Sequence, residues 1–264
     1  MNKLNLKICI IGASNLSWQI SIAFKNAGLE ISQVFNRTLV KAEELARLIN
    51  SKPISDIDLL DKNADIYLVS VKDKALAEVL SIMKVGKGMV VHTSGTHGIE
   101  VFNNYSFENF GVFYPLQTFS KGSNVDINKV PFLIESNKKE GEDLLVLLAK
   151  RISENVQLMN SEKRKYLHIA AVFANNFSNY MFNVAEEILS SHNISYDLLK
   201  PLIKQTCSKA ISNLPKDVQT GPAFREDYKT IESQMELLSE NDNLKEIYRL
   251  ITEGIIKQKK YGQL

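Results

Sequence analysis

The positions of hydrophobic residues divide the chain into two parts. Up to residue 159, short continuous runs rich in Val and Ile alternate with segments of helical periodicity. Such runs are typical of strands buried on both faces of a parallel sheet. The predicted strands are 6–11, 31–35, 65–71, 89–92, 111–114, 131–134 and 156–159, and helical patterns lie between the early ones at 14–27, 39–50 and 74–83. This alternation predicts an α/β fold with a doubly wound, mostly parallel Rossmann sheet.

The rest of the chain has a helical pattern throughout. Four helical segments are predicted, at 162–191, 195–213, 223–239 and 243–260. Pro215 and the pair Gly221-Pro222 interrupt the pattern between them, as expected of residues that end or introduce helices. We therefore predict a Rossmann domain at 1–160 and an all-α domain at 161–264.

Charge and composition exclude several kinds of partner. Lys and Arg number 32 against 30 Asp and Glu, and this near balance lacks the basic excess of nucleic-acid-binding proteins. No stretch approaches the ~20 apolar residues that span a bilayer, so no membrane contact is expected. Cys9 and Cys207 lie far apart in apolar segments, which indicates buried thiols and a reducing, cytoplasmic location. Because the sequence has no CxxC pair and no Cys/His cluster, no metal site is predicted.

The turn after the first predicted strand has the spacing of a dinucleotide-binding motif. A Rossmann turn needs small residues at three positions, for a tight turn, for approach to the pyrophosphate and for helix packing. Gly12, Ser14 and Ser17 occupy these positions. Two serines in place of glycine weaken the motif taken alone, but the turn follows a strand and opens a helix, as the motif requires. The residues assigned to cofactor binding here are Gly12, Ser14, Asn15 and Leu16.

The second predicted strand ends in Asn36-Arg37-Thr38, which bears on the choice of cofactor. An enzyme that prefers NAD usually places Asp or Glu here, and this chain has neither. A guanidinium suits the 2′-phosphate of NADP(H), so NADP is the predicted cofactor. The alternative is a solvated arginine beside a helix N-cap threonine. The loop Ser70-Val71-Lys72 is expected beside the cofactor's ribose and nicotinamide, while Asp73 is interpreted as a helix cap.

Six short segments match a known pattern over nearly the whole chain: IIG at 10–12, NRT at 36–38, VHTSG at 91–95, YPLQTF at 114–119, ANNF at 174–177 and QTGPA at 219–223. In these segments the chain resembles Rossmann reductases related to pyrroline-5-carboxylate reductase and the deazaflavin-dependent NADP oxidoreductases. It is most similar to the bacterial family that joins such a domain to a helical domain of unknown function. The resemblance implies a second domain of the 6-phosphogluconate dehydrogenase C-terminal type and a homodimer formed through it. It implies no particular substrate.

Polar residues at the ends of two strands are candidates for chemistry. Ligands of open α/β sheets bind beyond the carboxyl ends of the strands, where His92 and Ser94 are expected. His92 is therefore a candidate acid or base and Ser94 a substrate ligand, although a structural histidine in a plain turn is an equal alternative. After the next strand, Gln117 and Thr118 offer hydrogen bonds to substrate, or else belong to a packed aromatic loop.

A stripe of polar residues follows the first helix of the all-α domain. At 100° per residue, one arc of about 100° holds His168, Asn175, Asn176, Asn179 and Asn183. The other faces are apolar and are expected to be buried, Phe173 and Phe177 among them. A buried polar group without a partner costs about 1–3 kcal/mol, so each member needs one. We predict that the stripe lines the substrate cleft; hydrogen bonds between helices or across a dimer are the alternative.

The resemblance also bears on the catalytic group. Related β-hydroxyacid dehydrogenases carry a catalytic lysine and an asparagine on the corresponding helix, but this chain has no K-x-x-x-N spacing there. His168 is the best replacement, with Asn175 as a second catalytic candidate, and Lys163 and Lys165 remain alternatives. Further along, Arg225 could bind a substrate carboxylate, or form a surface pair with Asp227.

Together these features predict an oxidoreductase that transfers a hydride between NADP(H) and a small carbonyl or imine compound. The cofactor supplies the hydride, and the protein supplies orientation and a proton. A histidine suits the proton transfer because it ordinarily titrates near ~6.5, so His168 or His92 is the expected acid/base group. The alternatives are a non-catalytic protein that binds or senses NADPH and, less favoured, a methyltransferase with a nucleotide-like cofactor.

Overall fold

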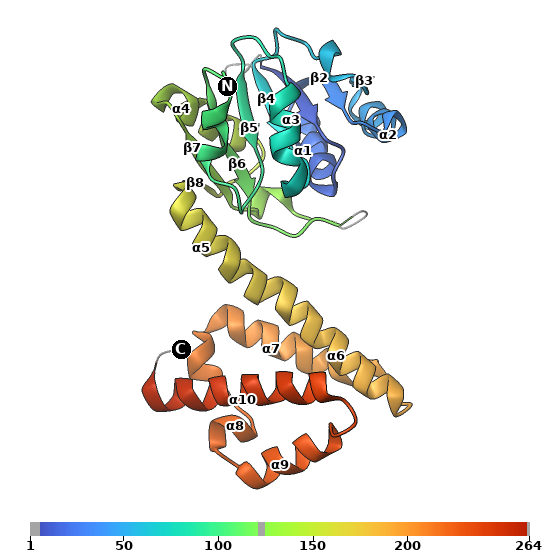
Figure 1. Ribbon diagram of the computed structural model, residues 1–264, viewed down its shortest axis with the longest axis vertical. Helices are drawn as coiled ribbons and strands as arrows, with labels where there is room; N and C mark the ends of the chain where they lie inside the picture. Colours follow the sequence, from blue (N-terminus) through green and yellow to red (C-terminus); the bar gives the residue numbers. More distant parts are fainter. Residues whose placement is uncertain (1–5, 121–124, 263–264) are drawn as a thin grey trace. The chain divides into compact units, whose positions relative to one another are not determined.

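The computed structural model describes residues 6–120 and 125–262. The chain folds into two compact units, Met1–Asn176 and Phe177–Leu264 (Figure 1). The last strand ends at Leu158 and the long helical segment begins at Ser161, close to the predicted domain boundary at 160/161. The first helix of this segment nevertheless belongs to the first unit. A site can therefore be built from the sheet and this helix alone.

The first unit is built on one eight-stranded sheet in the order β3-β2-β1-β4-β5-β6-β7-β8. Neighbouring strands are parallel except β6 and β7, which confirms the mostly parallel Rossmann fold. The strands are β1 (Lys7–Ile11), β2 (Glu30–Phe35), β3 (Lys52–Ile54), β4 (Ile66–Val69), β5 (Met89–His92), β6 (Phe110–Pro115), β7 (Phe132–Ser136) and β8 (Val156–Leu158). The sequence pattern missed β3, a three-residue edge strand containing Pro53.

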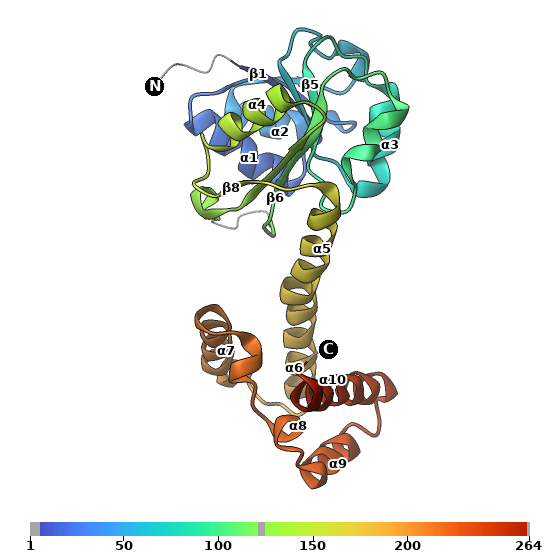
Figure 2. The ribbon, with the colours of Figure 1, turned by 90° about the vertical axis from the view of Figure 1, so that its left-hand side faces the viewer.

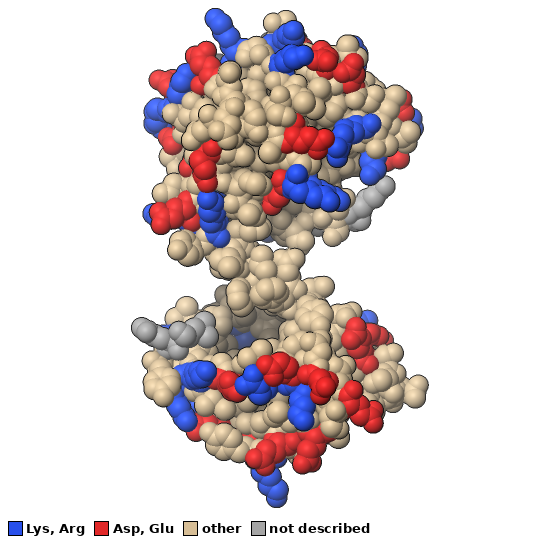
Figure 3. Space-filling view, in the orientation of Figure 1, with Lys and Arg blue, Asp and Glu red and all other residues tan. Residues whose placement is uncertain are grey.

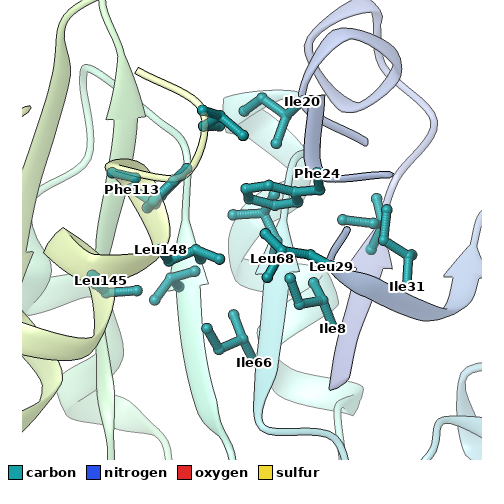
Figure 4. Packing of buried hydrophobic residues seen from close by; sticks show 14 of the residues in the cluster. Ile8, Ile20, Phe24, Leu29, Ile31, Ile66, Leu68, Phe113, Leu145 and Leu148 are labelled. Atoms are coloured by element: carbon teal, nitrogen blue, oxygen red, sulfur yellow. The ribbon is translucent and has the colours of Figure 1, made fainter. Parts of the chain in front are cut away.

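Helices cover both faces of the sheet (Figure 2). Ile8 and Ile10 of β1 pack in one core with α1 (Asn15–Asn26), α2 (Leu39–Ile49) and α4 (Lys139–Ala149), part of which Figure 4 shows. Cys9 and Ile11 point to the opposite core, beside α3 (Asp73–Ile82). This alternation within one strand buries both faces of the sheet. Helix α4 was not predicted, because its fully buried positions lie only in its second half.

The two cysteines have different surroundings. Cys9 is fully buried, and desolvation raises the pKa of its thiol from 9.0 to about 11. Cys207 lies in α7 (Lys200–Ser212) of the second unit and is exposed. The prediction of two buried thiols is therefore wrong for Cys207, because no other part of the described chain covers that position of α7.

The predicted 162–191 helix contains a change of helical type. The chain runs through α5 (Ser161–Ala171), a π-helical segment (Val172–Phe177) and α6 (Ser178–Ser191). A π-helix closes i→i+5 hydrogen bonds, so residues beyond Ala171 no longer follow a 100° step from His168. The predicted five-residue stripe is therefore wrong as a single helical face.

The second unit consists of helices, and its buried residues among those described are Ala223, Ile231 and Thr252. Besides α6 and α7 it holds α8 (Pro222–Arg225), α9 (Tyr228–Leu237) and α10 (Asp242–Tyr261). The predicted 223–239 helix is divided at Glu226, which has a left-handed φ of 58°. Large apolar side chains stay on the surface of the isolated chain, with Ile211 85% and Leu237 84% exposed. Among residues 6–120 and 125–262, none of the helices combines the length and the hydrophobicity that a bilayer span requires.

Candidate functional site

The turn after β1 is a cradle that only glycine fits. Gly12 has a φ of +103°, and a Cβ added there would lie 2.3 Å from the carbonyl oxygen of Ser70. Its amide donates to the carbonyl of Phe35 at 2.8 Å. The backbone of β1 thus turns between the ends of β2 and β4, where it can approach a ligand closely.

The two serines at the other glycine positions form a capping box at the start of α1. Ser14 Oγ accepts from the Ser17 amide at 3.1 Å, and Ser17 Oγ accepts from the Ser14 amide at 3.3 Å. Ser14 Oγ also lies 2.8 Å from Ser70 Oγ, which joins the cap to β4. Helix geometry leaves the Asn15 and Leu16 amides without an intrahelical acceptor, so an anion can use them. The two serines at the glycine positions therefore have a structural role, which is to cap α1.

The Asn36-Arg37-Thr38 segment lies next to this turn. Asn36 Oδ1 accepts from the Ala13 amide at 3.3 Å, and its Nδ2 donates to the carbonyl of Thr38 at 3.0 Å. Thr38 is the N-cap of α2. The side chain of Arg37 is 69% exposed and forms an ion pair with Glu78 of α3 at 3.2 Å. The guanidinium is therefore accessible to a phosphate, although a carboxylate competes for it.

The loop after β4 contributes the next part of the same edge. Ser70 is buried, Val71 packs beside the core around α3, and Lys72 is the N-cap of that helix. Asp73 is the first residue of α3 and not its cap, so the interpretation of Asp73 as a helix cap is wrong: the N-cap position belongs to Lys72, and no side chain makes a capping hydrogen bond there.

His92, at the end of β5, is fully buried. Its side chain is 0% exposed, Nδ1 accepts from the Ser94 amide at 3.1 Å, and Nε2 lies 3.4 Å from the carbonyl of Gly98. Burial, followed by the charge of Arg164, lowers the pKa of His92 from 6.5 to about 3. His92 is thus neutral near pH 7 and has no solvent contact, and these surroundings do not support the predicted acid/base role.

Ser94 supports the same turn. Its Oγ accepts from the amides of Thr96 at 3.1 Å and His97 at 3.0 Å. Both bonds stabilise the loop after β5, so the plain-turn alternative describes Ser94 better than a role as substrate ligand.

A cavity of about 410 Å³ lies beside the next strand and is formed entirely within the first unit. The residues that line it are Tyr114, Leu116, Gln117, Thr118, Phe119, His168, Ala171, Val172, Ala174, Asn175 and Asn176. Five predicted substrate or catalytic positions meet there, namely Gln117, Thr118, His168, Asn175 and Asn176. The cavity lies between the end of β6 on one side and α5 with the π-helical segment on the other.

Inside this cavity His168 and Tyr114 form a hydrogen-bonded pair. Tyr114 Oη lies 3.0 Å from His168 Nδ1, with the two rings edge to face. Burial, as the largest cause, raises the pKa of Tyr114. Asn15 Nδ2 donates to the carbonyl of Phe119 at 3.1 Å, which links the glycine turn to the cavity wall.

A buried ion pair anchors α5 against the sheet. Arg164 is 0% exposed and donates to Glu135 Oε2 of β7 at 2.5 Å and to the carbonyl of His97 at 2.9 Å. Ser161 Oγ, at the start of the helix, donates to the same carboxylate at 2.7 Å. His168 stands one turn after Arg164, so this network determines where the His168 ring lies.

The remaining predicted residues belong to the second unit. Asn179 is exposed on α6, and Asn183 donates to Glu187 of its own helix at 2.7 Å. Arg225 is exposed at the end of α8, while Asp227 caps α9 by accepting from Thr230. The expectation that Phe173 and Phe177 are buried is wrong for the isolated chain, since both are exposed.

Sequence reasoning overlooked Tyr114, Gly95, Arg164 and Glu135 as parts of the site. Tyr114 could have been found, because it ends a strand at the same edge as His92. The Arg164–Glu135 pair joins residues 29 positions apart and left no local pattern.

On the face that Figure 3 shows, Lys and Arg are interspersed with Asp and Glu, and neither sign forms a large patch, in keeping with a net charge of +2. Among the residues the structure describes, no group of three or more His, Cys, Asp or Glu side chains could hold a metal ion.

Comparisons with known proteins agree with this architecture. A family model described as "Domain of unknown function (DUF2520)" matches residues 130–255. A Bacteroides fragilis structure described as a "putative NADP oxidoreductase" is 36% identical, with a TM-score of 0.89, over 96% of this chain and 98% of its own. No protein of curated function matches the sequence.

Two more distant structures share the fold. The 1-pyrroline-5-carboxylate reductase of Streptococcus pyogenes is 17% identical, with a TM-score of 0.63, over 97% of this chain and 98% of its own. An imine reductase of Myxococcus stipitatus, in complex with NADP+, is 14% identical, with a TM-score of 0.71, over 97% and 95%.

The fold and the glycine turn define the class of Rossmann-type nucleotide-binding proteins. Within it, the chain belongs to the family of NADP oxidoreductases that carry a DUF2520 domain in their C-terminal region. NADP, the predicted cofactor, is the one named for the Bacteroides relative and present in the imine reductase.

Proposed function

We propose that the protein is an NADP(H)-dependent oxidoreductase that transfers a hydride to or from a small carbonyl or imine compound. The observation that supports this best is the His168–Tyr114 pair in a cavity at the edge of the sheet that carries the glycine turn. Strands β1 and β6 are three strand spacings apart in the sheet, roughly 14 Å. A dinucleotide could therefore extend from the glycine turn after β1 to the cavity beside β6.

The residues present fit a dinucleotide. Gly12 allows the tight turn that the motif needs, since a Cβ there would collide with the carbonyl of Ser70. The Asn15 and Leu16 amides and the Arg37 guanidinium are available to phosphates. Ser14 and Ser70 shape this turn. Asn36 and Thr38 position Arg37. Val71 and Lys72 lie along the path from the turn toward β5. When bound, NADPH supplies a hydride.

The chain's own residues would bind and orient the substrate and manage its proton. His168 suits the acid/base role better than His92, because it lines the cavity and His92 is buried. Asn175, Asn176, Gln117 and Thr118 offer neutral hydrogen-bonding groups to the substrate. Roles for Asn179 and Arg225 stay predictions, as does a cytoplasmic location.

The function can be tested first through cofactor choice. NADPH should bind at least ~10-fold more tightly than NADH, about 1.4 kcal/mol, because Arg37 offers the 2′-phosphate charge-assisted hydrogen bonds. Arg37→Ala should remove most of this preference. Isothermal titration calorimetry measures both constants, and equal affinities of the wild type for the two cofactors would contradict the assignment.

Glu78 provides a matched variant for the same titration. Its carboxylate pairs with Arg37 and would repel the 2′-phosphate, so Glu78→Gln is expected to tighten NADPH binding and to leave NADH binding unchanged. If NADPH binds and no carbonyl or imine compound promotes its oxidation, the protein is a sensor rather than an enzyme.

We also propose that the protein forms a homodimer through its helical part. Large apolar side chains are exposed on α5, α7 and α9, among them Ile169, Leu202, Ile211 and Leu237. Exposed apolar surface of this extent marks an interface more often than a free surface. Light scattering at micromolar concentration should give twice the monomer mass of 29.8 kDa.

A charge on this surface should dissociate the dimer. Leu202→Glu is expected to yield a monomer, since burying a carboxylate in an apolar interface is costly. Leu59→Glu is the control, because Leu59 is as exposed as Leu202 (59% and 62%) and lies in the first unit. A wild type that remains monomeric would refute the proposed interface.

A further inference from the structure

Tyr114 has no assigned role so far, although it stands at the wall of the candidate substrate cavity. It lies near the end of β6, and its side chain lines the cavity together with His168. The hydroxyl is 3.0 Å from His168 Nδ1. A phenol and an imidazole joined in this way can pass a proton between them.

The surroundings fix both rings. Gly95, in the loop after β5, approaches so closely that a Cβ there would lie 2.5 Å from His168 Nδ1 and 2.9 Å from Tyr114 Cζ. On the helix side, Arg164 anchors α5 one turn before His168. Three separate elements therefore hold the phenol and the imidazole against each other at the cavity wall.

We infer that Tyr114 donates the proton to the substrate and that His168 restores it, an inference that rests on the proposed function. As the substrate carbon accepts the hydride, the O–H bond of Tyr114 breaks and a new O–H or N–H bond forms on the substrate heteroatom. The tyrosinate oxygen then takes a proton from Nδ1 of His168, and the ring gains one from solvent at Nε2, which balances the reduction.

The hydroxyl of Tyr114 carries its proton before the substrate is reduced. Burial raises the pKa of Tyr114, so the hydroxyl keeps that proton at neutral pH until charge develops on the substrate heteroatom. Nδ1 faces the hydroxyl, while Nε2 is the other site at which the ring can exchange protons.

Tyr114→Phe tests the inference, because it removes the hydroxyl and keeps the ring. Tyr105→Phe is the matched control, since the Tyr105 hydroxyl also forms a hydrogen bond within the first unit, which it donates to the carbonyl of Ala77. NADPH oxidation is followed with 2-methyl-1-pyrroline as the imine and 2-pentanone as the ketone. Tyr114→Phe should lower kcat at least ~100-fold while KM and NADPH affinity stay within about threefold, as loss of a proton donor predicts.

A second measurement does not depend on turnover. In ¹⁵N NMR spectra the His168 Nδ1 signal should shift in Tyr114→Phe and stay unchanged in Tyr105→Phe, because only the former loses the hydrogen-bond partner. Turnover of Tyr114→Phe near the wild-type rate, or an unmoved Nδ1 signal, would overturn the inference while leaving the proposed function intact. Failure of the wild type to bind NADPH would instead overturn the proposed function.

Discussion

Gly12→Ala is expected to abolish NADPH binding and to lower the stability of the first unit. The added Cβ would lie 2.3 Å from the carbonyl oxygen of Ser70 and 2.9 Å from Val71 Cγ1, at a φ of +103° that non-glycine residues rarely adopt. Backbone strain and overpacking each cost about 1–3 kcal/mol, so a loss of at least ~2 kcal/mol should follow. Because the end of β1 must move, NADPH affinity should fall more than ~100-fold, as measured by calorimetry.

Gly28→Ala separates the clash from the backbone strain. Gly28 also has a positive φ, of +75°, but a Cβ there would meet nothing within 4 Å. This variant should lose only the stability that corresponds to backbone strain, about 1–2 kcal/mol, and should bind NADPH as the wild type does. If Gly12→Ala bound NADPH equally well, the glycine turn would not be the cofactor site.

Among substitutions of the site residues, Arg164→Met should cause the largest loss of stability. Removing one partner of a buried ion pair costs about 3–5 kcal/mol, because the other charge is left uncompensated. Glu135 would keep its bonds from Ser161, and the carbonyl of His97 would lose its donor. For a chain of this size we expect the melting temperature to fall by roughly 10 °C in differential scanning fluorimetry.

Arg249→Met is the matched control. Arg249 also pairs with two carboxylates, Glu246 and Glu253, but its side chain is 42% exposed. Surface pairs of this kind contribute about 0–1 kcal/mol, so the melting temperature should hardly change. Equal shifts for the two variants would show that the buried network contributes no more than a surface pair.

Elements with strong local patterns could be predicted from the sequence. The continuous Val and Ile runs located every strand except β3, which is too short to show a pattern and has Pro53 at its centre. The glycine turn and the loops after β4, β5 and β6 could be placed because each follows directly from a strand. The fold and the edge that carries the site were therefore accessible to reasoning from periodicity.

Features that depend on distant contacts were not. The Tyr114–His168 bond joins residues 54 positions apart, and only the packed structure brings them together. The polar stripe could be predicted only in part: His168, Asn175 and Asn176 line one cavity, but the π-helical segment that begins at Val172 changes the angular step on which the five-residue face was based. His92 shows the third limit: a strand-end histidine looks catalytic until its burial and its two backbone partners are known.

The contrast between the two thiols makes the native chain suitable for selective labelling. Cys9 is enclosed in the core, and its pKa of about 11 leaves almost no reactive thiolate at neutral pH, whereas Cys207 is exposed on α7. A maleimide should therefore attach a single fluorophore or spin label to each chain, with no engineered cysteine. Because α7 carries Leu202 and Ile211 of the proposed interface, the labelling rate of Cys207 would report subunit exchange directly.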